Sequence, residues 1–429
     1  MPPLTAQSAI QLQLEDVNEV IPFLVEITNK LDSRIKDNGR STQVSLKSFR
    51  VRIQTADVGD VAKFQPDGGT MPLGGSSEWD QFLVTPIAFV VPIQYTRLAD
   101  EVGEPKTVST TNPVSKTIAD AVRVVQVRRD MFLQTNGDGK IATIDPTYVA
   151  GNNPIILASS PWGARLCRRG QQVQVMKSDF TVVRGTCTIQ DKVSTVGLTQ
   201  TIRVDQVPNQ NGGAQPGDII VVNGIAPGGA DPFVNGIPVF HNTNPNGNLL
   251  GVSRQNNYVV ANGVNANNAQ VTLPLLRLAM NQVEVELGED ALGTQIYHTH
   301  PSQLAAYEEL GFKLETVFSE SGKFNDKGFD GLFNKKKLTI DGYEIVSNLH
   351  ADNTRWDFTN VKSWGKVRWG GGTRWFKNRA GTTVFQQYDF TTGTIKAIEN
   401  SYLVDYIQYY VDNPKLLSSL TSCRLPALN

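Results

Sequence analysis

Two histidines placed two positions apart are the residues of this chain best suited to metal chemistry. His298 and His300 are separated by one residue, and a strand that carries histidines at this spacing can bind zinc. A zinc site also needs a third ligand and a second set of groups that orient the ligands. The remaining histidines, His241 and His350, lie far away in the sequence. We therefore interpret residues 297–301 as an ordinary loop and expect no metal site.

The other short motifs do not assemble a catalytic or cofactor site either. Residues 136–139, Asn-Gly-Asp-Gly, resemble part of a calcium loop, but the glutamate that an EF-hand needs at its twelfth position is absent. The glycines at 370–372 are not followed by the lysine and hydroxyl residue of a phosphate-binding loop. The chain has no Gly-x-Ser-x-Gly elbow and no local Cys/His pair. We therefore expect no catalytic residue, no bound cofactor and no enzymatic activity.

Clusters of basic residues offer binding chemistry instead. Lys335, Lys336 and Lys337 can bind an anionic surface, although such a run is more often a solvated loop, which is the interpretation we favour. A second cluster lies on one face of the helix expected over 113–135 and consists of Lys116, Arg123, Arg128 and Arg129. We expect this face to pair with acidic groups of a neighbouring molecule, such as the cluster Asp100, Glu101 and Glu104.

The composition excludes strong global attraction to nucleic acid or membranes. In 429 residues, 40 basic and 41 acidic side chains leave a net charge of −1, so any nucleic-acid contact has to be local. No long apolar run and no signal-peptide pattern is present, so we expect neither a membrane span nor a secretory leader. The three cysteines indicate a reducing compartment, in which we expect Cys167 and Cys187 not to form a disulfide.

The elements that position these groups begin with a long hairpin. Phe49, Val51 and Ile53 alternate with polar residues, and a second alternating stretch follows at 82–95. A strand of that length reaches about 46 Å. The tip at 65–78 holds four glycines and two prolines. Because an isolated hairpin is only marginally stable in water, we expect this one to lie on a neighbouring surface, which favours assembly over catalysis.

Prolines and apolar periodicity define the other elements. Pro86 and Pro92 lack the N–H that a strand interior needs, which indicates an edge strand or a bulged ribbon. Helices are expected in an N-terminal arm over 8–36 that Pro22 interrupts, from Pro113 to the 136–139 turn, and at 272–287 and 301–318. Short strands at 166–253 indicate a small inserted barrel. A strand pair with an Asp341-Gly342 turn is expected at 336–346, and a β-rich segment at 381–411 that ends at Asn413-Pro414. The parent fold is therefore α+β.

The order of these elements resembles that of the major capsid proteins of tailed phages, which have the Hong Kong 97 fold. That family runs from an N-terminal arm through a long extended-loop hairpin and a spine helix to a central A domain, which is interleaved with a peripheral P domain. The similar segments are 51–100 (hairpin and return), 116–139 (spine helix and glycine-rich exit), 251–263 (strand entry to the A domain), 273–283 and 296–307 (helix, strand and second helix) and 338–346 (strand pair).

The resemblance implies an α+β fold of the Hong Kong 97 type with an inserted small β-barrel. It divides the chain into an N-terminal arm (1–36), a P domain (37–46, 97–150 and 376–429) with the spine helix at 113–136, an extended-loop hairpin (47–96), an A domain (151–165 and 254–375) and the inserted barrel domain (166–253). Residues expected at contacts between subunits are Lys63, Glu78, Trp79, Asp100, Glu101, Arg123, Arg129, Lys335 and Lys336.

The implied function is that of a structural protein that self-assembles into hexamers and pentamers and forms an icosahedral shell around packaged double-stranded DNA. Its partners are then other copies of itself, a separate scaffolding protein (because few residues precede the body of the chain), a portal, DNA without sequence specificity and, where one binds, a decoration protein. We expect it in the virion, assembled in the host cytoplasm, with no membrane contact. The alternatives are an encapsulin-like compartment shell without the barrel, a β-rich adhesin or decoration protein, and an enzyme.

Overall fold

The computed structural model describes residues 31–37, 41–45, 48–56, 76–97, 113–195, 199–228, 232–254, 260–318, 339–378, 381–389 and 393–425. The chain divides into two compact units, and neither is a single stretch of sequence. The described part of unit 1 lies within 31–32, 86–132 and 368–407, and that of unit 2 within 33–85, 133–367 and 408–425. The units are therefore interleaved along the sequence.

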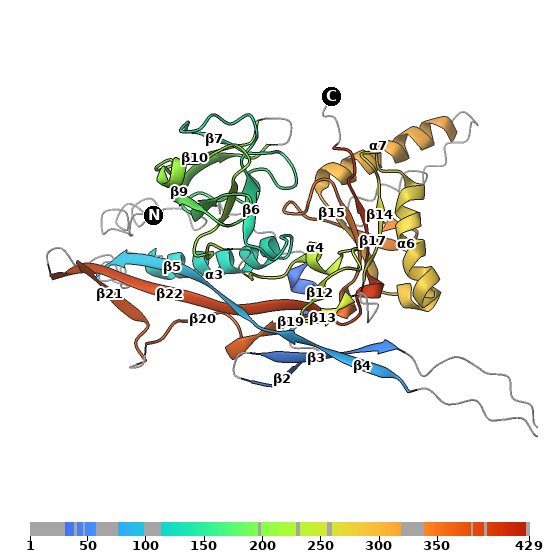
Figure 1. The fold of residues 1–429 in the computed structure, drawn as a ribbon, viewed down its shortest axis with the longest axis horizontal. Coiled ribbons are helices and arrows are strands. Elements are labelled where there is room, and N and C mark those ends of the chain that lie inside the picture. The colour runs from blue at the N-terminus through green and yellow to red at the C-terminus, as the bar shows by residue number, and fades with distance from the viewer. Residues whose placement is uncertain are drawn as a thin grey trace, which may run out of the picture. The chain divides into compact units, whose positions relative to one another are not determined.

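Unit 1 is built on one long strand. Its elements are β5 (Ile87–Thr96), helix α3 (Pro113–Phe132), β20 (Arg374–Trp375), β21 (Val384–Asp389) and most of β22 (Thr394–Val411). Strand β5 pairs with β22 in antiparallel fashion along all ten of its residues, and β20 and β21 pair along the other edge of β22. Figure 1 shows α3 running along this sheet. The β-rich C-terminal segment that the sequence predicts is confirmed.

One face of the sheet packs on α3. Strand β5 alternates, so Ile93 and Tyr95 are buried together with Leu403 of β22 and Ala121 of α3. The rings of Phe89 and Phe132 meet edge to face, with centroids 5.6 Å apart. The predicted start of the helix at Pro113 is confirmed. The helix ends at Phe132, however, before the 136–139 turn. Val122 is 36% exposed, whereas the neighbouring Ala121 is buried.

The hairpin belongs to unit 2. Strand β3 (Phe49–Ala56) lies between β2 (Ser41–Gln43) and β4 (Glu78–Val84), and Val51 stands opposite Phe82. The alternation of β3 and β4 buries one face of this sheet, which includes Phe49, Val51, Ile53, Phe82 and Val84. Residues 57–75, which include the predicted tip up to its last residues, lie outside the described part of the chain.

The return strand expected over 82–95 is two strands in the structure. The first part is β4, which pairs with β3, and the second is β5, which pairs with β22. The break falls at Thr85–Pro86, because proline donates no backbone hydrogen bond and restricts the residue before it. The prediction of a single long hairpin is therefore wrong. The edge position of Pro92 is confirmed, since β22 is the one described strand that pairs with β5.

A second sheet of unit 2 closes on itself. Its six strands, in spatial order, are β6 (Lys140–Thr143), β11 (Ile219–Val222), β8 (Gln172–Met176), β9 (Val183–Val193), β10 (Thr201–Val204) and β7 (Ile155–Ile156). The first and last strands are joined by a bridge between Ile144 and Leu157 and by the N–H of Ala158, which donates to the carbonyl of Thr143. Because β6 and β7 precede residue 166, and no described strand of this sheet follows β11, the predicted range 166–253 is wrong at both ends.

The third sheet of unit 2 is mixed and has helices on one side. Its order is β14 (Asn262–Asn265), β23 (Ser418–Thr421), β18 (Trp356–Asn360), β15 (Gln295–Thr299), β17 (Tyr343–Ser347) and β16 (Thr339–Ile340). Leu276 and Val283 of α6 (Leu273–Leu287) share a buried core with Tyr297, Phe358 and Leu420. Both predicted helices, α6 and α7 (Pro301–Phe318), are confirmed, as is the tight turn at Asp341-Gly342, whose φ angles are both positive. No described helix is long and apolar enough to cross a membrane.

The remaining elements are short. They are η1 (Asp32–Arg34), β1 (Lys36–Asp37), η2 (Gln210–Gly212), α4 (Ile237–Phe240), β12 (Asn248–Leu249), β13 (Val252–Ser253), η3 (Glu289–Leu292), η5 (Val361–Ser363), β19 (Trp364–Arg368), η6 (Trp369–Gly371) and η7 (Pro414–Leu416). Strand β1 pairs in parallel with β19, these two strands extend the sheet of β22, and β12 pairs with β13. The predicted N-terminal helix lies outside the described residues except for its end, where η1 and β1 replace it. The end of β22 at Asn413-Pro414 is confirmed, since the Asn413 side chain caps η7.

Two predicted domain boundaries also differ from the structure. We expected 97–150 and 376–429 in one domain, but β6 joins the closed sheet and β23 joins the mixed sheet, both in unit 2. The reason is that strands are placed by their hydrogen-bonded partners, and these partners stand far away in the sequence. Local pattern alone does not show that β23 lies between β14 and β18.

A substitution at Gly365 tests how tightly β19 packs against Tyr410 of β22. A Cβ at this position would overlap with the buried ring of Tyr410. We expect Gly365→Ala to lower the free energy of unfolding by about 2–3 kcal/mol through overpacking. Gly342→Ala is the control, because its surroundings are open and only its positive φ is unfavourable, at a cost of about 1 kcal/mol. Urea unfolding of both variants measures the difference, and an equal or smaller loss for Gly365→Ala would contradict this packing.

Candidate interaction surfaces

The structure describes four of the nine residues expected at subunit contacts. Lys63, Asp100, Glu101, Lys335 and Lys336 lie outside the described residues. Glu78 and Trp79 are neighbours on β4 of unit 2, whereas Arg123 and Arg129 lie on α3 of unit 1. The two pairs are therefore carried by different units, and only the first pair lies on an open surface.

The outer face of the hairpin is suited to contact with another molecule. Trp79 is 63% exposed and Leu83 is 53% exposed, and both point away from the buried face of β4. Across the sheet, Leu83 stands opposite Arg50, and Gln81 stands opposite Arg52. An exposed indole and an isobutyl group beside two guanidinium groups combine apolar area with charge, as protein interfaces commonly do.

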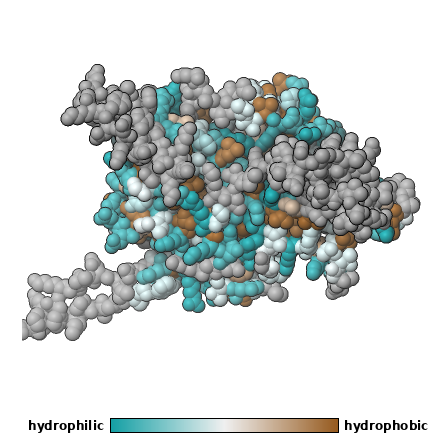
Figure 2. Space-filling model, turned by 180° about the vertical axis from the view of Figure 1, so that it is seen from behind, coloured by the Kyte–Doolittle hydropathy of each residue, from teal (hydrophilic) through white to brown (hydrophobic). Residues whose placement is uncertain are grey.

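Elsewhere, large apolar side chains reach the surface separately. In the view of Figure 2, brown hydrophobic residues form small patches between teal hydrophilic ones. Among the described residues the most exposed are Val285 at 84%, Ile395 at 64%, Trp79 at 63% and Val149 at 62%. Of these, Trp79 lies on the hairpin and Val285 on α6.

Arg129 is not a surface residue, so our expectation for it is wrong. Its side chain is buried, and its Nε donates to the carboxylate of Asp405, which has no solvent exposure. Its Nη2 donates to Thr373 Oγ1 at 2.5 Å, and Arg368 Nη2 lies 3.7 Å from the second oxygen of Asp405. The basic face of α3 therefore binds its own chain at this point, whereas Arg123 is partly exposed.

Asp405 and Arg368 were missed by sequence reasoning. The signal was present in β22, where Asp405 is an acidic residue within a run of mostly aromatic and aliphatic side chains. A charged residue in such a strand indicates a buried partner of opposite charge. The sequence did not show which arginine supplies the partner, because Arg129 and Asp405 are 276 positions apart.

All four histidines of the chain are buried in unit 2. His298 lies on β15 directly opposite Asp357 of β18, and His300 follows that strand, so the predicted loop is wrong. His241 Nδ1 lies 3.0 Å from the carbonyl oxygen of Ser418 and 3.5 Å from Asp357 Oδ1. Alternation of apolar and polar residues in β15 cannot reveal this, since both faces of the strand are covered.

Burial keeps the imidazoles of His241 and His300 neutral. Loss of hydration lowers the pKa of His241 to about 4, with the Asp357 carboxylate opposing and Arg355 adding to the effect. Loss of hydration, together with Arg165 and His350, lowers the pKa of His300 to about 3. Arg355 donates to Asp357 Oδ1 at 2.5 Å, so the carboxylate already has a cationic partner. Within the described residues, no group of three or more His, Cys, Asp or Glu side chains is arranged around a metal position.

The three cysteines are buried free thiols, as the sequence predicts. Burial raises the pKa of Cys187 and of Cys423 to about 12. At neutral pH these thiols are therefore protonated and unreactive packing groups.

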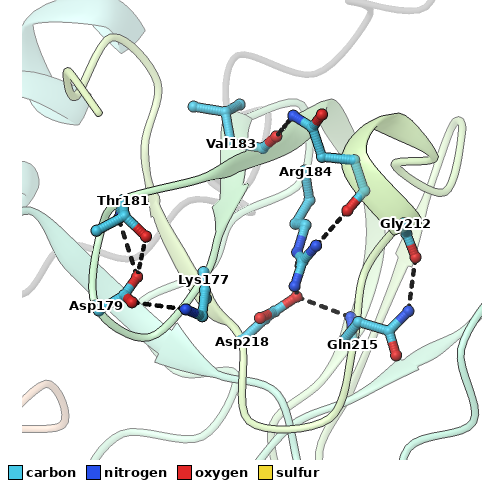
Figure 3. A network of polar contacts seen from close by, with 9 residues as sticks. Lys177, Asp179, Thr181, Val183, Arg184, Gly212, Gln215 and Asp218 are labelled. Carbon is cyan, nitrogen blue, oxygen red and sulfur yellow. Dashed lines mark hydrogen bonds and ion pairs between the residues drawn. The ribbon is translucent and has the colours of Figure 1, made fainter. Parts of the chain in front are cut away.

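Loops at one end of the closed sheet are joined by a polar network (Figure 3). Arg184 Nε donates to Asp218 Oδ2 at 3.1 Å, and the same oxygen accepts from the Gln215 N–H at 2.9 Å. Asn211 Nδ2 donates to the carbonyl of Val183 at 2.8 Å. Nearby, Asp179 accepts from Lys177 and Thr181. These polar groups are paired with one another, so the network fixes the loops and presents no catalytic arrangement.

The comparisons with known proteins concern the fold. The chain matches no protein-family model and no curated protein. Among solved structures, the capsid of cyanophage A-1(L) is similar over 95% of this chain and 97% of that chain, with a TM-score of 0.51 and 11% sequence identity. The chain has the Hong Kong 97 capsid fold.

Two further structures are similar to a lesser degree. The capsid of a native GTA particle covers 95% of this chain and 94% of that chain at a TM-score of 0.47 and 8% identity. The SrpI encapsulin of Synechococcus elongatus covers 98% and 96% at a TM-score of 0.46 and 9% identity. The fold assignment rests on the cyanophage capsid. The predicted α+β fold of the Hong Kong 97 type is thus confirmed.

The pairing of Asp405 can be tested by removing its charge. Asp405→Asn leaves Arg129 and Arg368 close together without their carboxylate, so we expect a loss of about 3–5 kcal/mol in the free energy of unfolding. Glu344→Gln is the control, since Glu344 forms an exposed pair with Arg34, and such pairs contribute about 0–1 kcal/mol. Urea unfolding distinguishes the two, and similar small losses would show that Asp405 is not an essential charge.

The buried histidines predict a loss of stability in acid. In the unfolded chain, the side chains of His241 and His300 bind protons near pH 6.5. In the folded chain they do so only near pH 4 and pH 3, respectively. Stability is therefore unaffected above pH 6.5 and falls between about pH 6.5 and 4, by about 1.4 kcal/mol per pH unit for each histidine. Urea unfolding at pH 7, 6 and 5 measures this slope. His300→Gln should flatten it, and an unchanged slope in that variant would refute the assignment.

Proposed function

We propose that this chain is the major capsid protein of a tailed phage, which self-assembles into hexamers and pentamers and forms an icosahedral shell around packaged double-stranded DNA. The observation that carries the proposal is the shared fold, which extends over nearly the whole of this chain and of the cyanophage capsid protein. A capsid protein acts through the shape of its folded chain and not through a catalytic group. A similar fold along the whole chain therefore supports this function better than any single group of residues.

The outer face of the hairpin supports this proposal. It presents Trp79 and Leu83 to solvent, and more than half of each side chain is exposed in the isolated chain. In our proposal this face covers part of a neighbouring subunit. Many such modest contacts, repeated around a closed particle, give collective stability without one strong site. A net charge of −1 is compatible with dense packing of identical subunits.

We assign the capsid domains as follows. Unit 1 is the P domain, with α3 as its spine helix; β3 and β4 form the extended loop; the mixed sheet with α6 and α7 is the core of the A domain; and the closed sheet is an inserted barrel. The assignment keeps the order of elements that the sequence predicts and moves its boundaries to those of the observed sheets. Residues 1–36 remain our assignment for the N-terminal arm.

The proposed partners follow from this function. Other copies of the chain are the main partner, and a separate scaffolding protein and a portal direct assembly in the host cytoplasm. Packaged DNA contacts the inner surface without sequence specificity, and the closed sheet is the place for a decoration protein. The mature location is the virion.

Electron microscopy of the expressed chain, with and without a scaffolding protein, tests the proposal. We expect closed icosahedral shells of hexamers and pentamers. An encapsulin-like protein would instead close around a protein cargo when expressed alone. A chain that stays monomeric under every condition would refute the capsid function.

Trp79 provides a more local test. Trp79→Ala removes a largely exposed side chain, so we expect unfolding unchanged within about 0.5 kcal/mol. We expect the concentration needed for assembly to rise by about tenfold, because interface tryptophans contribute more than most residues. Val193→Ala, at an exposed position of the closed sheet, is the control. Sedimentation velocity measures assembly, and equal behaviour of the two variants would show that the hairpin face makes no contact.

A further inference from the structure

A groove follows the open edge of the mixed sheet in unit 2. It lies beside α6, has a volume of about 480 Å³, and is lined by Leu278, Gln282, Val285 and Glu286 of the helix and by Thr243 and Gly263 on the opposite side. Strand β14 is the last strand of the sheet at this edge. The groove therefore combines a helix wall with a strand that has one unpaired side.

Strand β14 presents backbone groups to this groove. The N–H of Asn262 donates to Leu417 at 3.0 Å and that of Ala266 donates to Thr421 at 2.9 Å, both toward β23. In a parallel pair, alternate residues direct their N–H and C=O to opposite sides. The backbone groups of Gly263 and Asn265 therefore point away from β23, and no described residue hydrogen-bonds to them. Such an edge is a template for a further strand.

The helix wall adds an apolar contact and a polar one. Leu278 is 48% exposed and Val285 is 84% exposed, and seven positions separate them, so they lie on one face of α6. Between them, Gln282 Oε1 is buried and has no hydrogen-bond partner among the described residues. Other atoms of Gln282 line the groove, so the helix wall is not entirely apolar.

Gly263 allows the side chain of Thr243 to pack closely against β14. A Cβ at this position would overlap with Thr243, so only glycine fits beside that side chain. The groove also lacks positive charge, since its one charged residue is Glu286, which lies 3.9 Å from Lys415. Nucleic acid needs basic groups and is disfavoured here, whereas an extended, largely uncharged polypeptide matches both the edge and the apolar wall.

We propose that an extended segment of a second copy of this chain occupies the groove and adds to β14 as a further strand. The inference rests on the proposed function, because a shell places identical subunits side by side and a second copy is then the polypeptide always present. The backbone of Gly263 and Asn265 supplies the ladder, and Leu278 and Val285 receive an apolar side chain. This contact closes the one open edge of the described sheet beside α6.

A charged double variant tests the contact. Leu278→Lys combined with Val285→Lys changes two exposed positions, so we expect a folded monomer with an unchanged circular dichroism spectrum. We expect the concentration that gives half-assembly, measured by sedimentation velocity, to rise by about tenfold or more. Val149→Lys is the matched control, since Val149 is 62% exposed in unit 2 and lies outside the groove. It should assemble like the wild type.

Hydrogen exchange tests strand addition itself. In wild-type particles the amides of Gly263 and Asn265 should exchange more slowly than in the monomer, by about tenfold or more, because they become hydrogen-bonded. Equal exchange in particle and monomer overturns the proposal, and so does a double variant that assembles like the wild type. Protection that appears only when a scaffolding protein is bound assigns the groove to that protein and also overturns it. A wild-type chain that never assembles refutes the capsid function itself, which distinguishes the two failures.

Discussion

Asp405 lies within β22 with no solvent exposure, and its carboxylate is held by Arg129 of α3 and by Arg368. A carboxylate at this depth is stable only while its cationic partners are in place. The pair therefore fixes the helix against one face of the sheet in unit 1. Strands β5, β20 and β21 all pair with β22, so their position relative to the helix depends on the same contact.

Unit 2 uses buried polar groups in a different way. The mixed sheet has an apolar face against α6 and, on the strands β15 and β18, His298 opposite Asp357. Arg355 compensates the carboxylate, and the buried imidazole of His241 stays neutral. Such an interior specifies one arrangement of strands because each polar group needs its own partner. The same interior makes the unit sensitive to acid, since protonated imidazoles cannot stay dehydrated.

The surfaces available for assembly are those that the single chain leaves unsatisfied. The hairpin exposes an indole and an isobutyl group, and the edge of β14 exposes backbone donors and acceptors beside Val285. Monomeric proteins commonly protect such edges against pairing. In the shell that we propose, copies of the chain provide this protection, so folding and assembly share the same chemistry.

The sequence by itself determined elements that are governed by neighbours along the chain. The start of α3 at Pro113, helices α6 and α7, and the turn at Asp341-Gly342 follow from caps, periodicity and glycine geometry. The tertiary structure decided the partners. It divided the return strand between β3 and β22, closed a sheet with β6 and β7, and buried Arg129 on Asp405, 276 positions away. Periodicity records that a side chain is buried, but hydrogen bonds and ion pairs between distant segments form only when the folded chain brings those segments together.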